Sequence, residues 1–123
     1  MASIKGRDTS PEKSVRNCLR QLGIRFRGNV SKLPGKPDFV VQGQKKAIFV
    51  HGCFWHGHKD CRRSARPATN RPFWDRKLDG NIARDRRNLR DLKKKDWNVL
   101  VIWQCQIKDE NKLVKRLLRF VEK

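Results

Sequence analysis

Three cysteines and one histidine have the side chains and the spacing of a metal site. Cys53, His58 and Cys61 lie close together in the chain, and Cys105 follows at a distance. Thiolates and an imidazole suit tetrahedral zinc, and a closed set of four such ligands is typical of a structural ion. We therefore predict one zinc ion at these four residues, the alternative being unrelated buried cysteines. Cys18 has apolar neighbours at helical spacing, which favours a buried thiol over a ligand.

Asp38 and two histidines offer the chemistry of phosphodiester hydrolysis. Asp38 is the only acidic residue between Glu12 and Asp60, and it opens an apolar run after a loop rich in proline and glycine. A carboxylate there can hold magnesium against a phosphate, although it can equally cap a strand or pair with an arginine. His51 and His56 are not needed to complete the zinc ligands. An imidazole with a pKa near 6.5 can take a proton from water, or it can support a ligand or contact DNA.

Adjacent aromatic residues occur between the metal-binding cysteine and histidine. Phe54 and Trp55 are neighbours, so in extended backbone they point to opposite sides and are difficult to bury in one small core. Beside positive charge, such rings can stack on bases or wedge between them; core packing is the equal alternative. Trp74 recurs at helical spacing with Leu78, which favours core packing for this ring.

The net charge points to a polyanionic partner. The 123 residues include 31 Lys and Arg against 12 Asp and Glu, a formal charge of +19, which far exceeds what solubility requires. Hydrophobic residues make up 37%, enough for one folded domain over 1–123. The chain has no apolar run long enough to span a bilayer, so we expect a cytoplasmic, nucleoid-associated protein without a membrane partner.

The elements that must position these residues follow the order α-β-β-β-α-β-α. Ser10, Pro11 and Glu12 are typical of a helix start. The run from 97 to 105 is mostly apolar, which indicates a central strand covered on both faces and ended by Cys105. The stretch 51–72 has no period and must be functional or held by something else. The predicted elements are a helix over 10–22, strands over 24–26, 38–41 and 47–50, a helix over 73–95, a strand over 97–105 and a helix over 109–123.

Several of these segments together resemble the very-short-patch repair (Vsr) DNA mismatch endonucleases. The central motif consists of residues 33–41 (LPGKPDFVV) and 48–56 (IFVHGCFWH). Residues 7–13 (RDTSPEK), Phe73 with Trp74, 84–87 (RDRR) and 102–105 (IWQC) extend the similarity over nearly the whole chain. The resemblance implies an α/β fold with a restriction-endonuclease-like core, in which helices flank a mixed central sheet and zinc pins one loop.

The resemblance also implies an activity and its cofactors. Members nick one strand of duplex DNA 5′ to the thymine of a T:G mismatch, in DNA repair, by hydrolysis with magnesium. Other repair proteins would be further partners of a monomeric enzyme. Two alternatives stay open: a related nuclease of a mobile element or defence system without mismatch specificity, favoured by the short stretch before Arg7, and a zinc-stabilised nucleic-acid-binding protein without catalysis.

Residue by residue, the resemblance assigns roles in catalysis, metal binding and DNA binding. Asp38 and the main-chain carbonyl of Val50 would bind magnesium, and His56 would be the base that activates water. Glu12 and His51 would hold metal-bound waters, while Asp85 would orient a histidine. The zinc ligands would be Cys53, His58, Cys61 and Cys105. The DNA-binding residues would be Phe54, Trp55 and Trp74 as an aromatic wedge, and Lys77 near the mispaired bases.

Overall fold

Residues 11–122 are described by a computed structural model, which has three α-helices around a four-stranded sheet. The predicted helix cap at Ser10 and the segment 7–10 of the family motif lie outside the described residues. The elements are α2 (Pro11–Gln21), β1 (Phe26–Gly28), β2 (Phe39–Val41), β3 (Lys46–His51), the 3-10 helix η1 (Arg62–Ser64), α3 (Arg71–Lys94), β4 (Asn98–Trp103), the 3-10 helix η2 (Gln104–Gln106) and α4 (Glu110–Glu122).

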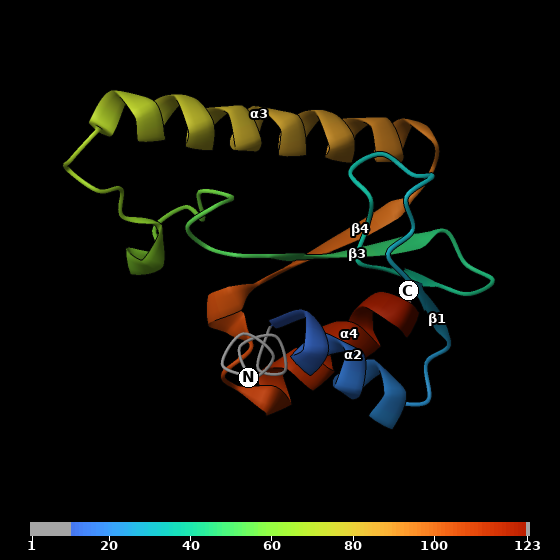
Figure 1. Ribbon diagram of the computed structural model, residues 1–123. Coiled ribbons are helices and arrows are strands. Elements are labelled where there is room, and N and C mark those ends of the chain that lie inside the picture. The colour runs from blue at the N-terminus through green and yellow to red at the C-terminus, as the bar shows by residue number, and fades with distance from the viewer. Residues whose placement is uncertain (1–10, 123) are drawn as a thin grey trace, which may run out of the picture.

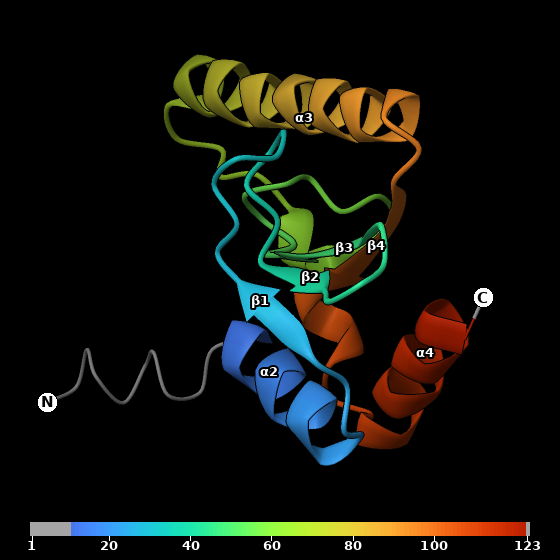
Figure 2. The same cartoon turned by 90° about the vertical axis from the view of Figure 1, so that its right-hand side faces the viewer.

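The described elements form three layers, with α3 on one face of the sheet and α2 and α4 on the other (Figures 1 and 2). The core on the side of α2 and α4 includes Leu19, Phe39, Ile48, Ile102 and Leu117, all fully buried. A smaller core on the side of α3 is built around Ala47, Phe49 and Leu92. Consecutive residues of β3 thus enter opposite cores, which confirms the predicted α/β architecture.

The sheet has the order β1-β2-β3-β4, and it is mixed as predicted. The first two pairs are antiparallel, whereas β3 and β4 are parallel. Parallel strands need a crossover connection, and here α3 provides it. The register pairs Val50 with Ile102 and His51 with Trp103, so the ends of β3 and β4 lie side by side.

Three details differ from the sequence-based prediction. The first strand begins at Phe26 because the amide of Ile24 instead donates to the Leu19 carbonyl at the end of α2 (3.0 Å). The strand β4 lies at the edge of the sheet, so its apolar sequence reflects helices on both faces and not a central position. Cys105 does not end this strand; it lies in η2, two residues beyond it.

The helix α3 is the longest element and extends beyond the sheet. Its first half covers the loop that follows β3, and its second half packs on the sheet (Figure 1). The loop over 52–70 contains only the short η1. Within the described part of the chain, no helix is long and apolar enough to cross a membrane.

Candidate active site and metal centre

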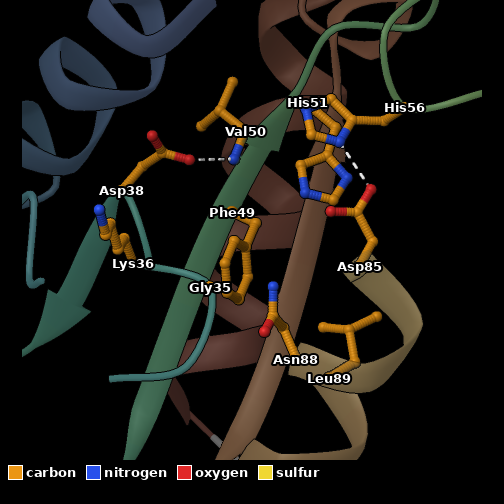
Figure 3. A pocket seen from close by; sticks show the side chains of 10 residues that line it. All are labelled: Gly35, Lys36, Asp38, Phe49, Val50, His51, His56, Asp85, Asn88 and Leu89. Atoms are coloured by element: carbon orange, nitrogen blue, oxygen red, sulfur yellow. Dashed lines mark hydrogen bonds and ion pairs between the residues drawn. The ribbon is translucent and has the colours of Figure 1, made fainter. Parts of the chain in front are cut away.

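A pocket of about 170 Å³ gathers most of the predicted catalytic residues (Figure 3). The loop before β2 contributes Asp38, the end of β3 contributes Val50 and His51, and α3 contributes Asp85. His56 enters from the loop after β3. Residues up to 47 positions apart in the sequence therefore meet at the end of the central strands.

The Asp38 carboxylate is held by backbone and faces a second acid. Its Oδ2 accepts a hydrogen bond from the Val50 amide at 2.7 Å (Figure 3). The pKa of Asp38 is raised to about 6 in all: burial raises it most and the neighbouring Glu12 carboxyl adds to this, whereas the Val50 hydrogen bond and His56 lower it. Two acids brought together in a partly dry site form a donor set that favours a hard divalent cation.

The imidazole of His56 is oriented by an acid on α3. Its Nδ1 lies 2.6 Å from Oδ2 of Asp85, and both side chains are partly buried. Because a carboxylate only accepts hydrogen bonds, Nδ1 carries the proton and donates, which leaves Nε2 able to accept one. This pair has the geometry of a general base with its orienting group.

His51 lies against His56. The two imidazole rings are stacked, with centroids 3.9 Å apart and planes 6° from parallel. Burial, with His56 as the second cause, lowers the pKa of His51 to about 4, so the ring is neutral at pH 7. Its buried Nδ1 has no hydrogen-bond partner among the described residues.

The four predicted zinc ligands come together in the structure. The sulfur atoms of Cys53, Cys61 and Cys105 and a ring nitrogen of His58 all lie within 4.8 Å of one another. None of these cysteines forms a disulfide, and Nδ1 of His58 lies 3.4 Å from the Cys105 sulfur. The imidazole of His58 also stacks on Trp103, at 4.1 Å between centroids. The cluster indicates a structural zinc that ties the loop after β3 to the end of β4.

The predicted wedge residues form an aromatic cluster with a fourth ring. Phe54 lies 5.1 Å from Trp55 and 5.5 Å from Trp74 between centroids, and Phe73 lies 5.1 Å from Trp74. Trp55 is 46% exposed and Phe73 50%. The aromatic cluster is therefore outside both cores, contrary to the packing role that helical spacing favours for Trp74. Lys77 is exposed one turn further along α3.

Some residues near these sites were missed by sequence reasoning. Phe73 belongs to the aromatic cluster, and its position beside Trp74 was the available signal. Lys36 and Asn88 line the pocket. The first stands two residues before Asp38, and the second lies one turn after Asp85 on the same helix.

Comparison with known proteins identifies the family. A family profile described as DNA mismatch endonuclease Vsr matches residues 1–63. The DNA mismatch endonuclease Vsr of Escherichia coli is 42% identical over 96% of this chain and 75% of its own length. The type II nicking enzyme V.XorIIP of Xanthomonas oryzae is 40% identical over 99% of this chain and 89% of its own.

A solved structure shares the fold. The catalytic domain of the homing endonuclease I-Bth0305I superposes with a TM-score of 0.65, covering 91% of this chain and 93% of that chain, at 24% identity. The sequence similarity is consistent with the order of elements and with the mixed sheet. The chain belongs to the Vsr DNA mismatch endonuclease family of strand-nicking enzymes.

Proposed function

We propose that this enzyme nicks one strand of duplex DNA 5′ to the thymine of a T:G mismatch, by magnesium-dependent hydrolysis, in DNA repair. The observation that carries the proposal is the pocket that is lined both by the Asp38 carboxylate, beside Glu12, and by the His56–Asp85 pair. The first pair is suited to a divalent cation, and the second is suited to proton transfer. Together they would supply the cation and the base for metal-dependent hydrolysis of a phosphodiester.

Asp38 and the main-chain carbonyl of Val50 would hold magnesium. The raised pKa of Asp38 fits this assignment because a cation beside the two carboxylates would offset their burial and mutual repulsion. Magnesium bound there would act as a Lewis acid that stabilises charge on the phosphate and the leaving oxygen.

His56 would activate the attacking water. Its Nε2 accepts the proton of that water, and the Asp85 carboxylate stabilises the resulting imidazolium at Nδ1. His51, neutral and stacked on His56, limits the movement of that ring. Glu12 and His51 would position water in the pocket, the latter through its unpartnered Nδ1.

Recognition would begin with charge and end with base unstacking. The excess of lysine and arginine draws the chain to phosphates, and Lys77 would approach the mispaired bases. The rings of Phe54, Trp55 and Trp74 would wedge between base pairs. Unstacking costs less where a wobble pair already weakens the helix, so selectivity would come partly from deformability.

The test is a nicking assay with two duplexes that differ only in one T:G or T:A pair. We expect the mismatched duplex alone to be nicked, in magnesium buffer and not with EDTA. Trp55→Ala should reduce this preference and retain the EDTA-sensitive chemistry. Equal nicking of both duplexes by the unmodified protein would refute mismatch recognition.

A second candidate is nicking without mismatch specificity, in a mobile-element or defence system. Curated relatives named type II nicking enzymes, at 39–40% identity, favour it. A panel of matched duplexes of varied sequence separates the two functions, since only this candidate predicts nicking of fully paired DNA. The family assignment argues against the third alternative, a protein without catalysis.

A further inference from the structure

Two rings of the aromatic cluster, Phe73 and Trp74, lie on a part of α3 that the sheet does not support. With 24 residues α3 is about 36 Å long, whereas the six residues of β3 span only about 20 Å. The first half of α3 therefore covers the loop that follows β3 (Figure 1). Contacts to that loop must fix where Trp74 lies relative to Trp55.

Arg66 makes the main polar contacts between this loop and the first half of α3. Its Nη1 donates to Oδ1 of Asp75 at 2.8 Å, and its Nη2 donates to Oδ1 of Asp79 at 2.7 Å. The Arg66 side chain is 19% exposed. The two acids are one helical turn apart, so a single planar guanidinium bridges a full turn of α3.

The surroundings of Arg66 make this arrangement more than an isolated surface pair. Asp75 also accepts a hydrogen bond from Nε of Arg71 at 3.0 Å, and hydrogen bonds from Arg66 and then Arg71 lower the pKa of Asp75. Linked, forked ion pairs hold geometry better than single exposed pairs do. Arg66 lies five residues after Cys61, so a zinc ion at the Cys61 cluster and the Arg66 contacts would hold the loop at two points.

The contacts of Arg66 with Asp75 and Asp79 are directly coupled to the aromatic cluster. Asp75 follows Trp74 in the chain, and Asn81 on α3 donates to the carbonyl of Trp55 at 3.1 Å. Movement of the loop away from Asp75 and Asp79 would thus separate the rings carried by α3 from those carried by the loop.

We propose that Arg66, Asp75 and Asp79 form a positioning clamp that holds the aromatic cluster in the arrangement that enters DNA. Arg66 is a positioning residue in this scheme and touches neither the substrate nor the reacting atoms. The inference rests on the proposed role of the aromatic cluster in DNA.

Asp79→Asn gives the sharpest test, because electrostatics and the clamp predict opposite results. Removing an acid from a chain of charge +19 should by itself tighten DNA binding. Loss of the clamp should weaken it. Asp91→Asn is the matched control, an exposed acid on the same helix without an ion pair among the described residues.

The readouts are the enzyme concentration for half-maximal nicking of a T:G duplex and the single-turnover rate at saturating enzyme. We expect Asp79→Asn and Arg66→Gln to raise that concentration about five- to tenfold, as for a lost charge-assisted hydrogen bond. The saturating rate, the zinc content and the melting temperature should change little. Asp91→Asn should lower the half-maximal concentration or leave it unchanged.

Two further variants check that the partners act together. The double variant Arg66→Gln with Asp79→Asn should bind no more weakly than Arg66→Gln alone, because either change removes the attraction between the same two charges. Arg66→Lys should restore binding only in part, since an ammonium lacks the fork that spans both acids.

Tighter binding by Asp79→Asn, equal to that of Asp91→Asn, would overturn the clamp. So would additive losses in the double variant. These outcomes are distinct from a failure of the proposed function, in which the unmodified protein would nick matched and T:G duplexes alike. In that case the same variants are compared on the matched duplex, where the clamp again predicts weaker binding.

Discussion

Replacing Asp38 by asparagine should stabilise the fold and abolish nicking. The Asp38 carboxyl is largely buried beside Glu12, and its pKa is raised from 3.8 to about 6. An acid whose pKa is higher in the folded than in the unfolded protein contributes most to stability at pH values below its pKa in the unfolded state. This contribution is lost as the pH rises through its pKa in the folded state. Above pH 6, therefore, the charged Asp38 carboxylate lowers the free energy of unfolding. Asparagine is uncharged and has no such cost. The amide oxygen of asparagine can still accept the hydrogen bond from Val50.

The size of the effect follows from the shift. At 1.36 kcal/mol per pKa unit, a rise from 3.8 to about 6 corresponds to about 3 kcal/mol, reduced to about 2–3 kcal/mol because the carboxyl is partly solvated. The gain should be largest at pH 8. At pH 5 it should be roughly half as large, because the folded protein then keeps Asp38 mostly protonated.

Urea unfolding of the zinc-loaded protein without other divalent cations measures this gain. Asp91→Asn controls for the change in net charge, as it removes an exposed acid. Magnesium should then stabilise the unmodified protein and leave Asp38→Asn unaffected, and the variant should bind T:G duplex without nicking it. The reasoning is refuted if Asp38→Asn gains no stability at pH 8, or if its gain does not shrink at pH 5.

Three further outcomes are expected. Cys61→Ser should lose zinc and melt at a lower temperature, which metal analysis and calorimetry measure. Cys18→Ala is the control and should keep its zinc. A Cys61→Ser variant that is fully loaded with zinc would contradict the predicted ligand set. His56→Ala and Asp85→Asn should each slow single-turnover nicking, about 10²–10⁴-fold for the loss of a general base. Their affinity for DNA should change little. An unchanged nicking rate would show that another residue is the base. If about eight phosphates are neutralised, affinity should fall about 10³–10⁵-fold between 50 and 200 mM salt; a flat salt response in a titration would exclude this binding mode.

Local signals were sufficient for most of the elements and for the zinc ligands. Apolar spacing predicted α3 and α4 to within two residues, because one face of each helix must be buried. Cys53, His58 and Cys61 are close in sequence, so their side-chain chemistry indicated a metal before any fold was known. The family resemblance added roles for Glu12 and Asp85 that spacing could not supply.

Contacts between segments that are distant in the sequence could be identified only from the tertiary structure. The edge position of β4 depends on which strands pair with each other. The apolar sequence of β4 indicates only that both faces of the strand are covered by other elements. Arg66 is one of many arginines in the sequence, and only the packing of the loop on α3 places it between two acids. The pKa of Asp38 likewise depends on burial by other elements. Residue type and spacing determine what each side chain can do, while long-range packing determines which side chains meet and how much water stays between them.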